Sequence, residues 1–279
     1  VMCIAMDPNT GEILAQVNLP DYDLNDPPRD DAEKLADMTR NKAIADQIDP
    51  GSVFKVFTAA AALEEGVVNE HSSFTCNGGL TVNGKFIKCH KTHEGSQNLE
   101  EGLANSCNPV FMRLALGLQK EKFYEYMDKF GFGKKTGIDC GAEGAGSLWK
   151  IKDVQDQDLA RMGFGQSISV TPLQEITAFC SLVNGGTVYQ PTLLKRVLDS
   201  EGKVVEEHEA EAVSHPISES TSAKMRSMLQ GVVEKGSGAK AQVSGYTVGG
   251  KTGTTQKKAK DTNDPEAISD KHIASFIGF

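Results

Sequence analysis

Long apolar runs are missing from this sequence. None of its stretches approaches the roughly 20 consecutive apolar residues that a membrane-spanning helix needs. A charged and then apolar segment of the signal-peptide type is also missing, and Val1 begins directly in strand-like sequence. We therefore expect the chain to be an excised part of a longer protein, with a targeting or anchoring segment upstream of Val1.

An excess of basic residues is missing as well. The 29 lysines and arginines are outnumbered by 38 acidic residues, which gives a net charge of −9. Because binding to phosphates needs a basic face, this balance argues against nucleic acid as a partner. With 279 residues, 39% hydrophobic and 24% charged, the chain has the size and composition of a globular domain. No repeat, low-complexity tract or linker interrupts it, so we predict a single domain over residues 1–279.

Cysteines are too few and too scattered for a disulfide framework. The six are Cys3, Cys76, Cys89, Cys107, Cys140 and Cys180. Cys76 and Cys89 flank a hairpin-like stretch with an Asn-Gly turn, so a disulfide between them is one option if the protein works outside the cytoplasm. With His90 and His93 they also form a Cys-x12-Cys-His-x2-His pattern that could hold zinc. We favour free thiols over both options, and we predict no metal site and no cofactor.

The pattern of apolar residues predicts a helical cluster inserted into a sheet whose strands come from both ends of the chain. We expect an opening hairpin from residues 2–6 and 12–17, helices over 31–38, 52–63, 98–105, 109–116, 172–184 and 218–235, strands within 187–213, 246–251 and 273–279, and a polar loop over 256–271. Gly66 and Gly117 are expected to end two of these helices, since glycine commonly follows the last helical residue.

Three short motifs stand in one order along the chain: Ser52-Val53-Phe54-Lys55, Ser106-Cys107-Asn108 and Lys251-Thr252-Gly253-Thr254. Each alone is a weak signal, because Ser-x-x-Lys occurs by chance in most chains of this size. Together they supply a nucleophile, a base, a proton relay, an amide clamp and a carboxylate anchor. These are the groups that acyl transfer from a peptide with a free terminal carboxylate requires.

The first motif pairs a serine with a lysine one helical turn later. A serine hydroxyl needs an adjacent base, and a lysine can be that base only if burial or a second cation lowers its pKa. The apolar neighbours of Lys55 would bury it, and Lys251 could be the second cation. We predict Ser52 as the nucleophile, with its backbone N–H free to stabilise an oxyanion, and Lys55 as the base. The alternative is a capping serine followed by a solvated lysine.

The second motif lies between two predicted helices. Ser106 is a candidate relay that passes protons between the lysine pair and a leaving amine, and Asn108 is a candidate clamp for the substrate backbone. The alternative is helix capping, because an asparagine before Pro109 suits the position that precedes a helix.

The third motif follows a predicted strand. Lys251 and the hydroxyls of Thr252 and Thr254 suit a terminal carboxylate. Gly253 would let a substrate chain approach the strand edge, and the N–H of Thr254 could complete an oxyanion hole. The alternative is an ordinary edge strand that runs into a polar loop.

Other motif-like stretches are assigned to structure rather than chemistry. Lys135-Thr136-Gly137 repeats part of the third motif but leads into loop-like sequence, so we predict a turn element there. The acidic run over residues 206–211 is predicted to be a solvated face. No histidine has an obvious aspartate and nucleophile as partners, so a Ser-His-Asp arrangement is not favoured.

Over nearly all of its length the chain resembles the transpeptidase domain of class B penicillin-binding proteins, the monofunctional enzymes that cross-link bacterial peptidoglycan. Beside the three motifs, the resemblance rests on residues 7–15, 50–51, 130–133, 136–138, 163–172 and 184–186. It implies an α/β fold of the α+β type, shared with serine β-lactamases. In that fold a five-stranded antiparallel sheet is sandwiched by helices, a mainly helical subdomain is added, and the active site lies at their junction.

The resemblance also implies a reaction and a setting. Ser52 would attack the penultimate D-alanine of a peptidoglycan stem peptide, an amine of a neighbouring stem peptide would resolve the acyl-enzyme, and β-lactam antibiotics would acylate Ser52. The enzyme would work at the extracytoplasmic face of the bacterial cell membrane, with cell-wall assembly proteins as partners. The family pattern adds a membrane anchor, a pedestal domain, and a strand and helix after Phe279. We therefore expect a fragment that lacks these parts and attaches to the membrane through a segment outside it.

Two other functions would use the same residues. A serine β-lactamase or β-lactam-sensing domain shares the motifs and differs in how fast its acyl-enzyme is hydrolysed. A catalytically idle scaffold in a cell-wall assembly complex would tolerate Ser52→Ala with no phenotype. No segment clearly supplies a dedicated deacylating glutamate, and the motifs are intact, so we predict the transpeptidase.

Overall fold

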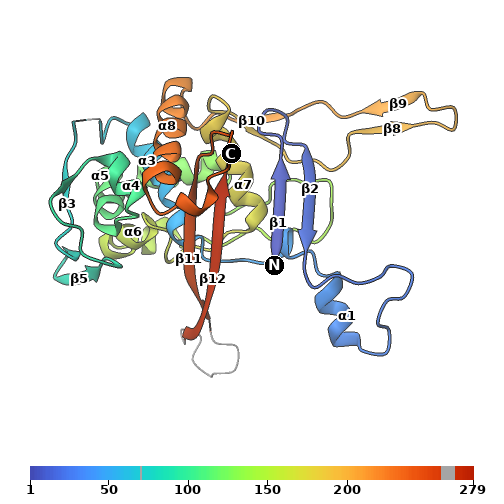
Figure 1. Ribbon diagram of the computed structural model, residues 1–279, viewed down its shortest axis with the longest axis horizontal. Helices are drawn as coiled ribbons and strands as arrows, with labels where there is room; N and C mark the ends of the chain where they lie inside the picture. Colours follow the sequence, from blue (N-terminus) through green and yellow to red (C-terminus); the bar gives the residue numbers. More distant parts are fainter. Residues whose placement is uncertain (70, 259–267) are drawn as a thin grey trace.

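Two antiparallel strand ladders and a cluster of helices make up the described part of the protein (Figure 1). The computed structural model describes residues 1–69, 71–258 and 268–279. One ladder pairs β1 (Met2–Met6) with β2 (Ile13–Asn18), and the other pairs β11 (Gly250–Lys258) with β12 (Ile268–Gly278). The ladders therefore come from opposite ends of the chain, as the sequence predicts.

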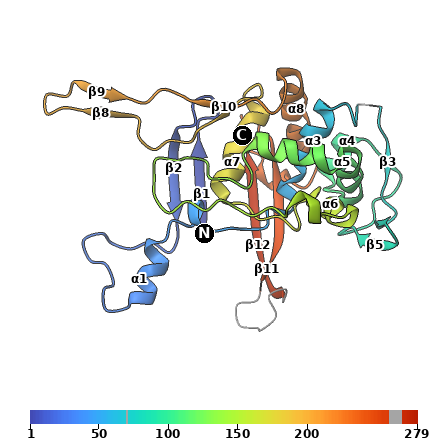
Figure 2. The ribbon, with the colours of Figure 1, turned by 180° about the vertical axis from the view of Figure 1, so that it is seen from behind.

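The family resemblance implies one continuous five-stranded sheet, and the described residues do not form such a sheet. β1 and β2 form one two-stranded sheet, and β11 and β12 form another. β12 and β1 are neighbours in Figures 1 and 2, but no ladder of hydrogen bonds joins them. Strands pair only when they approach to about 4.8 Å, so these four strands stay in two separate pairs. The resemblance places a further strand of its sheet after Phe279, beyond this chain.

Most of the helices pack on one another beside the second ladder, whereas α1 lies apart beyond β2 with none of its residues buried (Figure 2). They are α1 (Ala32–Thr39), α2 (Lys42–Ala45), α3 (Lys55–Glu64), α4 (Leu99–Ala104), α5 (Asn108–Phe130), α6 (Asp156–Met162), α7 (Pro172–Val183) and α8 (Glu219–Lys235). α3 lies at the centre, in contact with α4, α5, α7 and α8, and its first eight residues are all buried. The apolar run in the sequence thus forms the buried helix that we predicted.

Phenylalanine side chains pack around the start of α3, the end of the helix that carries Lys55. The ring of Phe54 lies 5.6 Å from that of Phe57 and 5.2 Å from that of Phe132. Tilted and edge-on pairs of this kind stabilise a fold by about 0.5–1.5 kcal/mol each beyond the burial of their area. Because Phe54 stands between Ser52 and Lys55, this packing fixes the segment that carries both.

α5 is longer than the sequence predicts. We expected a helix over 109–116 that ends at Gly117, but it continues to Phe130 across a kink at Gln119, whose φ is 63°. A Cβ atom on Gly117 would lie only 2.7 Å from Cγ1 of Val67. This glycine therefore allows the helix to pass close to Val67. The first helical part ends at the non-helical Gln119, so the predicted end near Gly117 lies close to this break, and a second helical part follows it.

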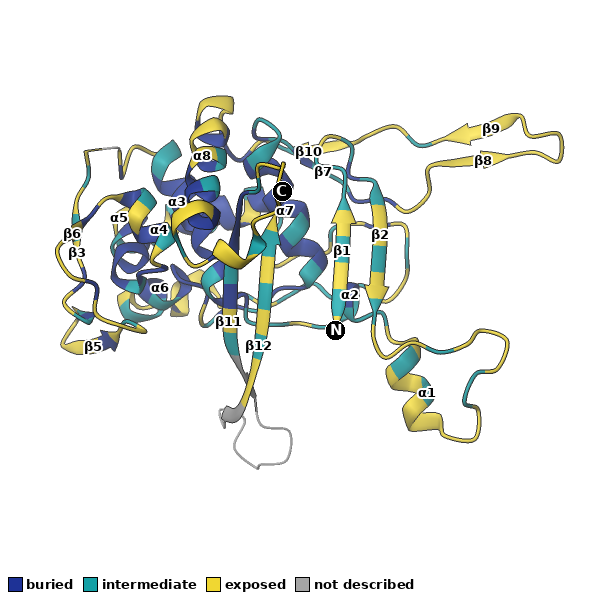
Figure 3. Cartoon of the chain, in the orientation of Figure 1, coloured by how far each residue is buried: buried dark blue, intermediate teal, exposed yellow. Residues whose placement is uncertain are grey.

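Short antiparallel strand pairs lie at the periphery. They are β3 (Phe74–Thr75) with β6 (Ser96–Gln97), β4 (Gly79–Val82) with β5 (Lys85–Lys88), β7 (Val188–Tyr189) with β10 (Ala212–Ser214), and β8 (Arg196–Leu198) with β9 (Val204–Glu207). Asn83 and Gly84, in the β4–β5 turn, both have positive φ, as the Asn-Gly pair predicts. The β8–β9 hairpin is exposed along both strands (Figure 3), which confirms the predicted exposed hairpin.

The last two strands differ from the prediction in their limits. β11 begins at Gly250, four residues after the expected start at Tyr246, whose side chain is 78% exposed. The predicted loop over 256–271 is strand at both ends, and its middle lies outside the described residues.

None of the helices in the described part of the chain combines the length and apolar character that crossing a membrane requires.

Candidate active site

Ser52 lies in a 3₁₀ turn, η1 (Gly51–Val53), directly before α3. Gly51 has a φ of +55°, and its N–H donates to the carbonyl of Gly165 over 3.0 Å. A Cβ atom on Gly51 would collide with Cγ2 of Thr255 on β11, so glycine is required where the turn meets the strand. The turn leaves Ser52 half-buried at a helix start, where backbone N–H groups lack intrahelical partners.

The side chain of Lys55 is fully buried and joins the first motif to the second. Its Nζ lies 3.0 Å from Oγ of Ser52 and 3.0 Å from Oγ of Ser106. The same nitrogen lies 2.6 Å from the carbonyl oxygen of Ser106 and 2.7 Å from Oδ1 of Asn108. The predicted nucleophile and base are therefore in direct contact, and the alternative of a solvated lysine does not hold.

These four contacts suit a neutral amine. The carbonyl oxygen of Ser106 and the amide oxygen of Asn108 only accept hydrogen bonds, so they take the two N–H groups of a neutral Lys55. The same nitrogen donates to Oγ of Ser52 and Oγ of Ser106, and either hydroxyl can in turn donate a proton to a neutral amine. Burial, followed by the charge of Lys251, lowers the pKa of Lys55 well below its ordinary value of 10.5. The structure thus gives Lys55 both features that a lysine base needs.

Ser106 stands between the two lysines. Its Oγ lies 3.0 Å from Nζ of Lys55 and 3.1 Å from Nζ of Lys251. Its φ of +55°, in the tight connection between α4 and α5, is uncommon for a residue other than glycine. Strain of this kind persists only where the surrounding structure holds it, and it is frequent at functional sites. A hydroxyl that contacts both amines has the geometry of the predicted proton relay.

Asn108 is the first residue of α5, and its side chain does not cap the helix. The capping alternative for this motif is therefore not what the structure shows. Its Oδ1 faces Lys55, and its Nδ2 lies 3.5 Å from the carbonyl of Lys88 at the end of β5. An amide N–H that is held this loosely can turn to a substrate carbonyl, as a backbone clamp requires.

Lys251 is buried in β11 and completes the cluster. Its Nζ also donates to the carbonyl of Thr252 over 3.1 Å, and burial lowers its pKa to about 8. Oγ1 of Thr252 donates to Oγ of Ser237 over 3.2 Å, so two hydroxyls lie near a buried cation. Such a group suits a carboxylate. Sequence analysis missed Ser237, because a lone serine after α8 carries no motif.

Gly253 and Thr254 continue β11 past the serine. A Cβ atom on Gly253 would collide with Oγ of Ser275 and lie 2.9 Å from Cγ2 of Val53, so glycine lets the strand pack against η1. This is a packing reason, and the approach of a substrate chain at this position stays a prediction. Thr254 is exposed and lies opposite Ala274 in the ladder.

Two predictions concern residues outside this cluster: the second Lys-Thr-Gly and the cysteines. Thr136 lies in a loop after α5 and donates to Glu143 through both its N–H and its hydroxyl over 2.6 Å, so the second Lys-Thr-Gly is a loop element. All six cysteines lie in the described ranges and are free thiols. Cys76, Cys89 and His93 come together with Cys107, which we did not predict, whereas His90 is not in that group.

The whole chain matches a family model. The model, described as the penicillin binding protein transpeptidase domain, matches residues 1–279. The chain belongs to this family. The transpeptidase domain is 42% identical, over 282 aligned residues, to stage V sporulation protein D of Bacillus subtilis. That alignment covers 100% of this chain and 43% of the relative, so the chain spans less than half of that protein.

Solved structures show the same fold for this transpeptidase domain. The D,D-transpeptidase domain of a peptidoglycan glycosyltransferase from Eggerthella lenta superposes with a TM-score of 0.87 at 26% identity, over 99% of this chain and 69% of that one. Penicillin binding protein 3 of Mycobacterium tuberculosis, complexed with aztreonam, gives 0.85 at 27% identity, over 99% and 62%. The predicted α/β fold class, with antiparallel strands and a helical subdomain, is thereby confirmed.

Proposed function

We propose that this transpeptidase domain cross-links peptidoglycan stem peptides through an acyl-enzyme on Ser52, and that β-lactam antibiotics acylate the same serine. The observation that carries the proposal is the chain of contacts Ser52–Lys55–Ser106–Lys251. A relative from Neisseria flavescens, 30% identical over 99% of this chain and 64% of its own length, is named a probable peptidoglycan D,D-transpeptidase. That name agrees with the chemistry the cluster can perform.

Acylation begins at the hydroxyl of Ser52. Its oxygen attacks the carbonyl carbon of the penultimate D-alanine while its proton passes to Nζ of Lys55. The negative oxygen of the tetrahedral intermediate is stabilised by the backbone N–H groups of Ser52 and Thr254. When the C–N bond breaks, the leaving D-alanine amine takes a proton from the lysine pair through Ser106. An ester on Ser52 remains.

The donor peptide is held at its terminal carboxylate and along its backbone. The hydroxyls of Thr252, Thr254 and Ser237 supply donors for the carboxylate, with the charge of buried Lys251 behind them. The amide of Asn108 holds the peptide backbone on the other side of the serine. These contacts require a free terminal carboxylate, which both a D-alanine-ended peptide and a penicillin carry.

An amine of a second stem peptide resolves the ester. It attacks the acyl carbon and its proton passes to Lys55. The ester C–O bond then breaks, a new peptide bond remains, and the oxygen of Ser52 takes the proton back from Lys55. Within the described residues, none of the hydrogen bonds of Ser52, Lys55 and Ser106 involves a carboxylate. A carboxylate is thus not among the direct hydrogen-bond partners of these three side chains in the described ranges, which supports transfer to an amine over the β-lactamase alternative.

We extend the proposal to the setting of the enzyme. Peptidoglycan lies outside the cell membrane, so this domain would work at the extracytoplasmic face of the bacterial membrane, attached through a segment beyond this chain. Other cell-wall assembly proteins would be its partners. The match to 43% of a longer relative supports a domain that works within a larger protein.

Intact-protein mass spectrometry after incubation with benzylpenicillin tests the proposal. We expect one equivalent of penicillin to add to the folded protein and to remain for hours, since the β-lactam ring opens onto the serine without loss of atoms. Ser52→Ala should give no adduct, and Ser200→Ala, in the exposed β8–β9 turn, should behave like the wild type. A transient adduct with consumption of penicillin would mean a β-lactamase. A folded protein that forms no adduct would mean an idle scaffold.

A further inference from the structure

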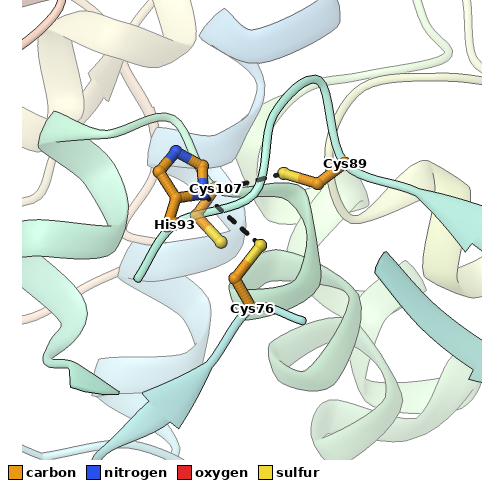
Figure 4. A group of neighbouring side chains, drawn as sticks. All are labelled: Cys76, Cys89, His93 and Cys107. Atoms are coloured by element: carbon orange, nitrogen blue, oxygen red, sulfur yellow. Dashed lines mark hydrogen bonds between the residues drawn. The ribbon is translucent and has the colours of Figure 1, made fainter. Parts of the chain in front are cut away.

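Four side chains of the types that bind soft metal ions converge beside the second motif (Figure 4). The sulfur atoms of Cys76, Cys89 and Cys107 and one ring nitrogen of His93 all lie within 4.8 Å of one another. Nδ1 of His93 is 3.4 Å from Sγ of Cys76 and 3.9 Å from Sγ of Cys89. The four residues come from separate segments: the ends of β3 and β5, the loop after β5, and the residue before α5.

We propose that Cys76, Cys89, His93 and Cys107 bind one zinc ion as a structural site. Tetrahedral zinc takes sulfur at about 2.3 Å and nitrogen at about 2.0–2.1 Å, which sets neighbouring ligand atoms about 3.5–3.8 Å apart. The cluster therefore has to contract by only about 1 Å at its widest. Three thiolates and one imidazole are a donor set of structural zinc sites, and thiolates disfavour magnesium and calcium.

Burial of the ligands supports a bound ion over ordinary packing. Cys76 and Cys107 are fully buried, and His93 is 8% exposed. Within the described part of the chain, Nδ1 of His93 has only thiols as polar neighbours. Buried imidazoles are ordinarily hydrogen-bonded. A neutral ring with its proton on Nε2 directs its lone pair from Nδ1 to the metal position, which gives this histidine a partner.

The surroundings also fit a metal site. Nε2 of Gln97, a residue that is itself buried, donates to Sγ of Cys107 over 3.3 Å. A hydrogen bond of this kind orients a ligand and stabilises its thiolate. Cys89 is partly exposed, so an ion can enter from that side. All four positions of a tetrahedral ion are filled by protein atoms, so the ion would hold structure and not activate water.

The site goes beyond the proposed function, because it assigns a role to a residue inside the second motif that acyl transfer does not use. Cys107 stands between Ser106 and Asn108, and both of these contact Lys55. A metal bond to Cys107 would tie the segment that carries β3–β6 to the start of α5. The ion would thereby fix the backbone that presents the relay and the clamp to the lysine.

Metal analysis of the purified, untagged protein tests the site. The protein should be prepared with reductant and analysed for metals by plasma mass spectrometry. We expect one zinc per chain, its loss in Cys89→Ser, and its retention in Cys3→Ser and Cys180→Ser, which remove an exposed and a buried thiol elsewhere. Chelation of the wild type should lower the Tm, and added zinc should restore it. Cobalt in place of zinc should give the absorption of thiolate-to-cobalt charge transfer.

Thiol counting separates zinc from a disulfide in the same place. For this count the protein is purified without reductant, and after denaturation with chelator six thiols should react per chain. Four reactive thiols and no metal would show a disulfide in the cluster and overturn the proposal, as would six thiols with no metal, or iron in place of zinc. Ser52→Ala should lose the penicillin adduct and keep its zinc, so this site and the proposed function can fail independently.

Discussion

At the scale of single residues, the site depends on two buried lysines that need different charges. Lys251, with a pKa of about 8, is mostly charged at neutral pH, as a carboxylate anchor must be. The pKa of Lys55 is lowered well below 10.5, first by burial and then by the charge of Lys251. One charged amine thus favours a neutral neighbour, with Ser106 between them to carry the proton.

Burial of Lys251 should make stability depend on pH in a defined window. Its pKa is about 8 in the folded protein against an ordinary 10.5, so the unfolded chain binds more protons between these values. The free energy of unfolding therefore rises with pH across this window. Relative to Lys251→Met, the wild type should gain about 2–3 kcal/mol between pH 7 and pH 10, measured by urea denaturation. Lys240→Met, at an exposed position, is the control. A constant difference between wild type and Lys251→Met would refute the burial argument.

Single residues could be predicted where a motif marks them. Ser52, Lys55, Ser106 and Lys251 were predicted from the order of three motifs, and the structure brings their side chains into contact. Ser237 could not be found this way. Its contact with Thr252 exists only because the fold brings two distant segments together, and the spacing of residues in the sequence does not show this. The place of Cys107 beside Cys76, Cys89 and His93 was missed for the same reason.

At the scale of elements, β11 is the wall of the site, and its fit against η1 depends on Gly253. A Cβ atom there would collide with Ser275 and press on Val53. Gly253→Ala should lower the free energy of unfolding by about 1–3 kcal/mol, as overpacking does, and slow acylation by moving β11 from Ser52.

Urea denaturation and the rate of the benzylpenicillin adduct measure both effects. Gly141→Ala is the matched control, because open space surrounds that glycine and its φ is not positive. If Gly253→Ala matched the wild type in both measurements, the close fit between β11 and η1 would not matter for the site.

Helix starts could be predicted from local chemistry, and some helix and strand ends could not. Thr171 and Ser218 each accept a hydrogen bond from a backbone N–H three residues later, and α7 and α8 begin where expected. The break in α5 falls at Gln119 and not at Gly117, and Gly117 instead makes room for Val67, a residue 50 positions away. Such tertiary reasons for a glycine leave no local trace.

At the scale of the whole molecule, the fold brings three distant segments to one point. Two ladders from the chain ends lie beside a helical cluster, and α3 at its centre meets the start of α5 and the strand β11. The family resemblance predicted this architecture, and the solved relatives confirm the fold class. It also implied a single five-stranded sheet, which the described strands do not form. The resemblance itself places one strand of that sheet after Phe279. The separation of the other four into two pairs is a long-range property, which no local pattern encodes.

The pH dependence of acylation tests the central claim most directly, namely that a neutral Lys55 activates Ser52. The second-order rate constant for the benzylpenicillin adduct would be measured from pH 6 to pH 10. We predict that the rate stops rising well below pH 10.5 and falls above about pH 8, where Lys251 loses the charge that holds the penicillin carboxylate. A rate that climbs about tenfold per pH unit through pH 10 would mean a lysine that is charged at neutral pH, and would contradict the account.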